Sequence, residues 1–167
     1  MNSPHVVAVM GVSGTGKSTI GALLADAVGV EFAEGDDFHP AANVAKMAAG
    51  LPLDDADRWP WLDRVGAWAA TRGESGGVVS CSALKRAYRD RLREAAPGVL
   101  FLHLAGGREL IERRMAAREG HFMPVGLLDS QFAALEELGA DEAGATVSVD
   151  GTPEEIVRRA VERLRER

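Results

Sequence analysis

Residues 11–18 read Gly-Val-Ser-Gly-Thr-Gly-Lys-Ser and directly follow the apolar run 6–10. This is the GxxxxGK[ST] spacing of a phosphate-binding loop, in its usual place between a strand and a helix. Glycines let the backbone curl so that successive N–H groups point at the phosphates of a nucleotide. Lys17 then reaches the β- and γ-phosphates, Ser18 offers its hydroxyl to Mg²⁺, and the helix N-terminus favours the same anion. We therefore expect a nucleoside triphosphate site, formed by Gly11, Ser13, Gly14, Thr15, Gly16, Lys17, Ser18 and Thr19.

A second group of chemically active residues follows the next apolar run. Residues 34–40 read Glu-Gly-Asp-Asp-Phe-His-Pro and place carboxylates beyond a strand end, where open α/β sheets bind ligands. Asp36 is the candidate that orients or deprotonates an acceptor hydroxyl, with Glu34 or Asp37 near the metal or in supporting contacts. Asp and Gly are also common in turns, so an ordinary turn explains this stretch equally well when it is taken alone.

Short apolar runs alternate with helix-like segments, which predicts a doubly wound α/β domain spanning residues 1–167, with a parallel sheet covered by helices. Helices are expected from near Ser18 to Gly29, after Pro60, and after a capping box at 152–155. The last of these helices carries arginines interspersed with glutamates, which is typical of a solvated face. The predicted strands are 6–10, 30–33, 78–81, 99–104 and 146–149.

Composition narrows the class of protein. Hydrophobic residues make up 46% and charged residues 26% of the 167 positions, as in an ordinary folded domain. A net charge of −6 argues against nucleic acid as a partner, because phosphate backbones require a basic surface. No membrane-length apolar run and no secretory signal is present, so we expect a cytoplasmic protein that does not bind membranes. The lone Cys81 makes a zinc cluster unexpected and is interpreted as a core residue.

Residues 113–124 carry several arginines before a loop containing Gly and Pro, and they join two expected helices. We interpret this segment, at about 113–126, as a lid that excludes water from the transferring phosphoryl group. Arg118 is the candidate that contacts that group, and His121 either contacts the acceptor or acts as a hinge. A basic helix end stabilised by its dipole is the alternative.

Four blocks of residues, in their order and spacing, closely resemble the gluconokinases, the small kinases that phosphorylate D-gluconate. Together they cover most of the chain, which makes the resemblance far more specific than the phosphate loop alone. The blocks are the loop 11–18; then 35–40, Asn43, 46–47, Gly50, 52–53, 57–58 and 60–62; then 81–85, 88–90 and 92–93; and finally 120–122, 130–132, 135–136 and 141–142.

The resemblance implies transfer of the γ-phosphate of ATP to the 6-hydroxyl of D-gluconate, giving 6-phospho-D-gluconate and ADP, with Mg²⁺ as cofactor. It also implies the three-layer αβα fold of P-loop NTPases, with a five-stranded parallel sheet, a short lid and a homodimer. The catalytic candidates are then Lys17, Asp36 and Arg118. By similarity, Arg114 stacks on adenine and joins Arg118 among the nucleotide contacts, while residues 150–153 border the base.

Gluconate has one carboxylate and several hydroxyls, so its site needs cations and polar side chains. Taken without the resemblance, Arg58 equally suits a surface pair with Asp54 or Asp57, and Lys85 with Arg89 equally suits a solvated helix face. The resemblance favours the substrate. The candidate substrate contacts are Asp36, His39, Arg58, Lys85, Arg89 and His121.

The third predicted strand does not end in the aspartate that commonly supports Mg²⁺ in phosphate-loop proteins, an absence that gluconokinases share. Metal support is then expected from Ser18, the ATP oxygens, water and Asp36. Two other functions have the same architecture: a shikimate-type or nucleoside monophosphate kinase, and a nucleotide-dependent switch. The guanine-reading pattern Asn-Lys-x-Asp, which a GTP switch would carry, is absent from the sequence.

Overall fold

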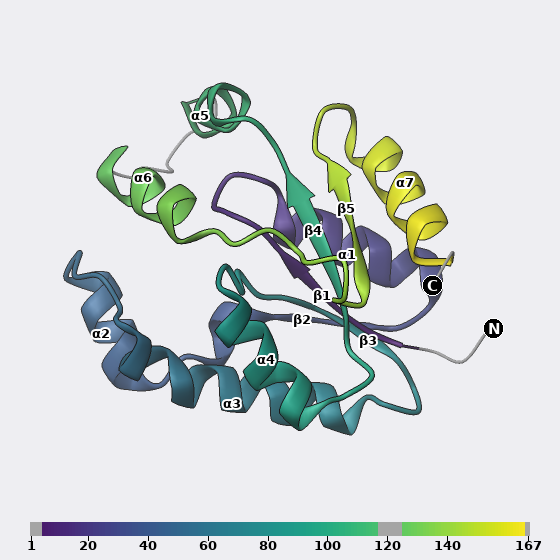
Figure 1. Ribbon diagram of the computed structural model, residues 1–167, viewed down its shortest axis with the longest axis horizontal. Coiled ribbons are helices and arrows are strands. Elements are labelled where there is room, and N and C mark those ends of the chain that lie inside the picture. Colours follow the sequence, from purple (N-terminus) through teal and green to yellow (C-terminus); the bar gives the residue numbers. More distant parts are fainter. Residues whose placement is uncertain (1–4, 117–124, 166–167) are drawn as a thin grey trace.

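A computed structural model describes residues 5–116 and 125–165 of the chain. Its centre is a five-stranded parallel sheet with the strand order β2-β3-β1-β4-β5, shown in Figure 1. Each strand lies within two residues of an apolar run that predicted it, so the expected parallel sheet is confirmed. The strands are β1 (Val6–Met10), β2 (Glu31–Glu34), β3 (Gly77–Ser80), β4 (Leu100–Ala105) and β5 (Gly144–Ser148).

Strand β1 lies in the middle of the sheet and is buried along its whole length. Because successive side chains of a strand point to opposite faces, Val9 joins one hydrophobic core and Met10 joins the other. A strand covered on both faces needs apolar residues at every position, which explains its uninterrupted apolar sequence.

Helices cover both faces of the sheet and complete the three layers (Figure 1). They are α1 (Lys17–Val28), α2 (Ala41–Ala48), α3 (Asp55–Thr71), α4 (Arg86–Ala95), α5 (Arg108–Ala116), α6 (Val125–Ala134) and α7 (Pro153–Arg165), with a short 3-10 helix η1 (Gly35–Phe38). On one face, Leu24 of α1 and Ile156 of α7 share a core. On the other face, Leu62 of α3 and Leu92 of α4 share the second core. In the described ranges no helix is both long and apolar enough to cross a membrane.

Helix α3 begins earlier than the sequence predicts, and Pro60 lies inside it rather than at its start. The reason is a capping box: the Asp54 carboxylate accepts the Asp57 N–H at 2.8 Å, while the Asp57 carboxylate accepts the Asp54 N–H at 3.0 Å. The additional turn places Asp55 and Arg58 on a regular helix near the carboxyl edge of the sheet.

The predicted ends of the first and last helices are confirmed. Gly29 caps α1 with a φ of 75°, in the left-handed region that favours glycine. At α7, the Glu155 N–H donates to the Thr152 hydroxyl at 3.2 Å, and the Thr152 N–H donates to the Glu155 carboxylate at 3.1 Å. Cys81 is buried in the core, as expected.

Candidate active site

The phosphate loop joins β1 to α1 with the backbone that its glycines predict. Gly14 and Gly16 have φ values of 85° and 88°, in the left-handed region that side chains disfavour. A Cβ atom at Gly14 would lie 2.8 Å from Met115 and 3.0 Å from Ile111, both on α5. Glycine is therefore required here by conformation and also by space.

The remaining predicted loop residues surround the start of α1. Gly11 and Thr15 are buried, Ser13 is half-buried, and Ser18 and Thr19 are exposed in the first turn of the helix. The N-terminus of α1 therefore opens toward the space where the sequence predicts the nucleotide phosphates.

The Lys17 ammonium lies within the curve of the loop. Its Nζ donates to the Val12 carbonyl at 3.1 Å, and the Thr15 hydroxyl donates to the same carbonyl at 2.8 Å. Loss of hydration lowers the pKa of Lys17 to about 8, although the negative charge of Asp36 opposes the shift. Asp36 therefore favours the charged form of Lys17, which burial in the loop disfavours.

A carboxylate at the end of β2 lies beside the phosphate loop. Glu34 accepts hydrogen bonds from the Ser18 hydroxyl at 2.6 Å and from the Ser80 hydroxyl at 2.5 Å. Strand pairing sets this position, since Glu34 lies opposite Ser80 in the β2–β3 register. The Ser80 hydroxyl also accepts the Gly35 N–H at 3.1 Å, which fixes the turn that follows.

Ser18 and Glu34 together fit a Mg²⁺ ion, which prefers hard oxygen ligands. Within residues 5–116 and 125–165, three or more His, Cys, Asp or Glu side chains do not converge on one point to hold a metal. A bound Mg²⁺ would then complete its coordination with phosphate oxygens and water. Of the carboxylates expected near the metal, Glu34 is the one in contact with Ser18.

Asp36 projects from η1 with its side chain 82% exposed, so the carboxylate is available to an incoming molecule. The residue before it must be glycine, because a Cβ atom at Gly35 would lie 1.8 Å from the Ser80 carbonyl oxygen. The Trp61 indole N–H donates to the Gly35 carbonyl at 2.8 Å. The turn that presents Asp36 is thus held by β3 and α3.

His39 lies close to Asp36, with 3.8 Å between its Nε2 and the Asp36 Oδ1. The imidazole stacks on Trp61 at a ring-centre distance of 4.3 Å, and its Nδ1 lies 3.1 Å from the Asn43 amide nitrogen. Burial lowers the pKa of His39, while the neighbouring Asp36 opposes that effect. His39 is therefore a largely fixed ring beside the exposed carboxylate.

Two predicted acceptor contacts meet around the single tyrosine of the chain. The Arg58 guanidinium and the Lys85 ammonium lie 5.5 Å and 5.6 Å from the centre of the Tyr88 ring. The Tyr88 hydroxyl donates to Asp55 at 2.5 Å, and Asp55 lies 3.5 Å from Lys85. Arg58 and Lys85, from segments far apart in the sequence, therefore form one positively charged corner at the edge of the sheet.

The alternative of a surface pair between Arg58 and its acidic neighbours does not describe the structure. Arg58 donates to the Leu53 carbonyl at 2.7 Å, while Asp57 instead accepts from Lys46 at 2.7 Å. Asp55 and Tyr88 were not among the predicted site residues, although Tyr88 lies in one of the blocks that carry the family resemblance. The signal in the sequence that could have identified Tyr88 was its place three positions after the candidate Lys85.

Arg89 does not join this corner, which corrects the expectation of a direct substrate contact. Lys85 occupies the N-cap position, just before the first turn of α4. The Arg89 side chain instead points inward and is 0% exposed. Its guanidinium donates to Glu142 at 2.7 and 3.0 Å and to the Ala83 carbonyl at 2.9 Å. Ala83 has a φ of 41°, unusual for a residue with a Cβ atom, so Arg89 stabilises the strained turn that leads to Lys85.

The arginine-rich segment is described only in part. Arg114, at the end of α5, donates to the Val149 carbonyl, just before the loop 150–153 that we expect to border the base. The predicted contacts Arg118 and His121 lie outside the described residues, as do positions 117–124 of the predicted lid.

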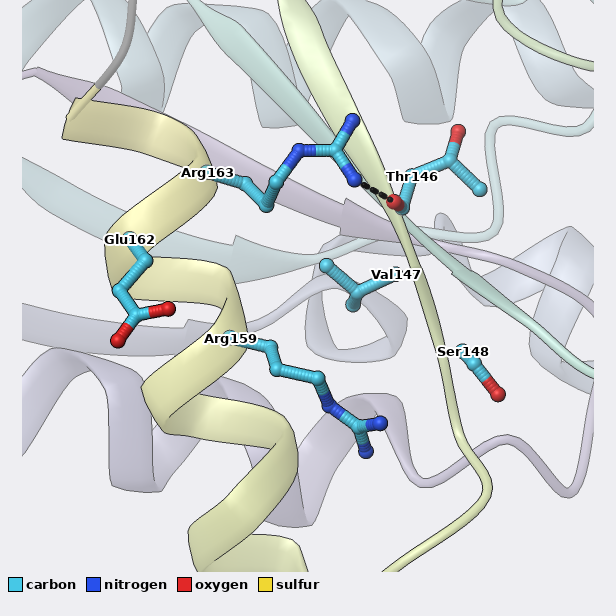
Figure 2. Close-up of a pocket in the computed structure, with 6 residues that line it drawn as sticks. All are labelled: Thr146, Val147, Ser148, Arg159, Glu162 and Arg163. Carbon is cyan, nitrogen blue, oxygen red and sulfur yellow. Dashed lines mark hydrogen bonds between the residues drawn. The ribbon is translucent and has the colours of Figure 1, made fainter.

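A separate cavity of about 180 Å³ lies between β5 and α7 (Figure 2). Arg163 donates to the Thr146 carbonyl at 3.2 Å, and Arg159 donates to the Asp150 carbonyl at 2.7 Å. Strand β5 is an edge strand, so Arg163 covers a backbone carbonyl that would otherwise be open to pairing, while Arg159 holds the loop that follows the strand. The cavity lies at the opposite edge of the sheet from β2, and we do not assign the active site to it.

Comparison with known proteins gives one consistent family. No protein-family model matches the chain. A gluconokinase from Gluconobacter oxydans is 44% identical over 160 residues, covering 95% of this chain and 90% of the relative. A thermosensitive gluconokinase from Escherichia coli is 50% identical over 136 residues, covering 80% and 73% of the two chains.

Solved structures agree with these relatives. The crystal structure of a gluconokinase from Sinorhizobium meliloti superposes with a TM-score of 0.92 at 47% identity, covering 99% of this chain and 94% of that one. Shikimate kinase from Aquifex aeolicus superposes with a TM-score of 0.65 at 14% identity, covering 96% of each chain. The second likeness shows the shared P-loop kinase fold alone, which confirms the predicted fold class.

Proposed function

The chain belongs to the gluconokinase family, and on that premise we propose that it transfers the γ-phosphate of ATP to the 6-hydroxyl of D-gluconate. The products are 6-phospho-D-gluconate and ADP. The observation that carries this proposal is the exposed Asp36 carboxylate on η1, two residues after Glu34, whose side chain contacts Ser18 of the phosphate loop. A donor loop and an acceptor-side base are thereby directed at one centre.

On the donor side, the loop N–H groups and Lys17 hold the phosphates in line for transfer. Lys17 balances the negative charge that develops on the transferred group, and Arg118 is proposed to contribute a second positive charge. Arg114, whose guanidinium donates to the Val149 carbonyl, is proposed to stack on the adenine. These roles are supported by loop geometry for Lys17 and by family resemblance for both arginines.

On the acceptor side, Asp36 orients the 6-hydroxyl and accepts its proton as the phosphoryl group moves. The Arg58 and Lys85 corner around Tyr88 supplies the positive charge that a sugar-acid carboxylate requires. His39 stacks on Trp61 with its side chain only 4% exposed, and we propose that its Nε2 edge beside Asp36 and the His121 side chain contact the hydroxyls.

We propose ATP and Mg²⁺ as the cofactors. Mg²⁺ would neutralise negative charge on the phosphates during transfer. Ser18 and Glu34 would hold it on the protein side, because their oxygens already converge at 2.6 Å.

The test is ADP release by the purified protein with MgATP, comparing D-gluconate with shikimate, nucleoside monophosphates and no acceptor. We expect release only with gluconate, and 6-phospho-D-gluconate by mass spectrometry. The variant Asp36→Asn should lower kcat by at least about 100-fold, as expected for loss of a general base, while MgADP binding is retained. Activity with a different acceptor, or full activity of the variant, would overturn the substrate or the base respectively.

We further propose a cytoplasmic homodimer with a single domain over residues 1–167 and without nucleic acid as a partner. The family resemblance supports the dimer, and the net charge of −6 supports the absence of nucleic acid binding. Sedimentation equilibrium of the purified chain measures the oligomeric state, and cell fractionation tests the location.

A further inference from the structure

One peptide unit of the phosphate loop is held at both ends. The carbonyl of Val12 accepts hydrogen bonds from Thr15 at 2.8 Å and from Lys17 at 3.1 Å, on the inner side of the loop. The N–H of the same peptide unit, which belongs to Ser13, donates to the Oε1 of Gln131 at 2.6 Å. The orientation of this peptide therefore depends on a side chain that lies 118 residues away in the sequence.

Both ends of the Gln131 side-chain amide form hydrogen bonds with Ser13. Its Nε2 donates to the Ser13 hydroxyl at 3.0 Å, while its Oε1 accepts the Ser13 N–H. The amide orientation follows from chemistry, because a backbone N–H only donates and must face the carbonyl oxygen. An apolar side chain of similar length would keep the volume of Gln131 but lose both bonds.

The helix that carries Gln131 is anchored independently of the loop. In the middle of α6, Asp129 pairs with Arg108 of α5, and the Arg108 guanidinium lies 4.8 Å from the centre of the Phe132 ring. Past the end of the helix, the Glu136 N–H donates to the Leu84 carbonyl at 2.7 Å. Gln131 therefore projects from a supported helix toward Ser13.

We propose that Gln131 is a positioning residue for the donor nucleotide, which fixes the Val12–Ser13 peptide so that Lys17 and the following N–H groups are aligned for phosphate. Without Gln131 this peptide can rotate, because Gly11 and Gly14 on either side of it are conformationally free. A rotated peptide would withdraw the Val12 carbonyl from Lys17 and misalign the loop. The catalytic part of this inference rests on the proposed function, whereas the nucleotide-binding part does not.

The experiment compares Gln131→Met with Ser130→Ala, a control at an exposed position of the same helix. MgADP affinity is measured by titration calorimetry in the absence of any acceptor, and steady-state kinetics then give the KM for each substrate. We expect roughly tenfold weaker MgADP binding for Gln131→Met, the size for loss of one or two hydrogen bonds. The KM for MgATP should rise by a similar factor, with the KM for gluconate and all values for the control unchanged.

A second pair of variants separates positioning from packing. Ser13→Ala removes the hydroxyl contact but keeps the N–H bond, so we expect a loss of only about twofold to threefold in MgADP affinity. In that background Gln131→Met should cost less than in the natural protein, because one of the two bonds is already absent. If Gln131→Met does not fold, Gln131→Asn, which is too short to reach Ser13, should show the same loss.

MgADP affinity within twofold of the natural protein in a folded Gln131 variant would overturn the proposal. An increase in the KM for gluconate alone would also overturn it, since that result places Gln131 on the acceptor side. If gluconate elicits no ADP release from the natural protein, the proposed function fails, and the calorimetric comparison still decides the role of Gln131.

Discussion

The carboxylate of Glu34 accepts a hydrogen bond from the hydroxyl of Ser18 at 2.6 Å, which joins the end of β2 to the phosphate loop. Many phosphate-loop proteins place a metal-supporting aspartate at the end of a different strand, and here that position in β3 is Ser80. Since Ser80 also donates to Glu34, at 2.5 Å, the third strand orients the carboxylate that it does not itself provide. The acidic support that we propose for Mg²⁺ therefore lies at the end of β2 rather than β3.

Replacement of this carboxylate should change the metal requirement. We expect Glu34→Gln to raise the concentration of free Mg²⁺ needed for half-maximal activity by about tenfold, because an amide is a weaker ligand for a hard cation. Titration of activity with Mg²⁺ at fixed ATP measures the shift. Glu31→Gln, at the exposed start of the same strand, is the control, and equal midpoints for the two variants would contradict the assignment.

The pH dependence of kcat/KM for MgATP should follow the ionisation of the Lys17 ammonium. Its pKa is lowered to about 8 by loss of hydration, so the free protein loses this positive charge as the pH rises through about 8. We expect kcat/KM for MgATP to fall above that pH. The value of kcat should fall less, since bound phosphates restore the protonated form. A kcat/KM for MgATP that stays flat to pH 9.5 would show that Lys17 remains charged in the free protein.

Substrate binding at the positively charged corner formed by Arg58 and Lys85 should depend on the Tyr88 hydroxyl. Tyr88→Phe keeps the ring beside Arg58 and Lys85 but leaves Asp55 without its 2.5 Å donor. Asp55 is then free to pair more closely with Lys85, which removes positive charge from the substrate. We expect the KM for gluconate to rise by about fivefold to tenfold, the size of one charged hydrogen bond, with the KM for MgATP unchanged. Glu94→Gln, exposed on the same helix, is the control, and a shift in both KM values would point to a general distortion.

Local sequence patterns predicted the features that depend on local chemistry. Apolar runs identified all five strands, and the runs of the inner strands β1, β3 and β4 are the most continuous because these strands are buried on both faces. The glycine and lysine spacing identified the phosphate loop, whose conformation is set by its own residues. Asp36 was placed at the carboxyl edge because it directly follows a strand.

Features that depend on distant partners were not predicted. Arg89 was predicted to contact the substrate, but it pairs with Glu142, which lies 53 residues away in the sequence. The role of Gln131 similarly depends on Ser13, which is 118 residues distant. Spacing indicates which residues share a helix face, but it does not indicate which face a distant segment covers.

The buried pair of Arg89 and Glu142 predicts a specific response of stability to acid. Burial alone would raise the pKa of Glu142, but hydrogen bonds from Arg89, the Gly139 N–H and Arg93 outweigh it and lower the pKa to about 2. A carboxyl group with a depressed pKa stabilises the fold above its ordinary value of 4.5, and this contribution is lost as the pH falls from 4.5 toward 2.

We therefore expect Glu142→Gln to lower the free energy of unfolding by about 3 kcal/mol at pH 7, with a difference from the natural protein that narrows below pH 4.5. Urea unfolding between pH 7 and 3.5 measures both effects. Asp63→Asn, which breaks an exposed pair of similar geometry with Arg91, should cost less than about 1 kcal/mol. Equal losses for the two variants, or a Glu142→Gln difference that stays constant with pH, would show that burial adds nothing to this ion pair.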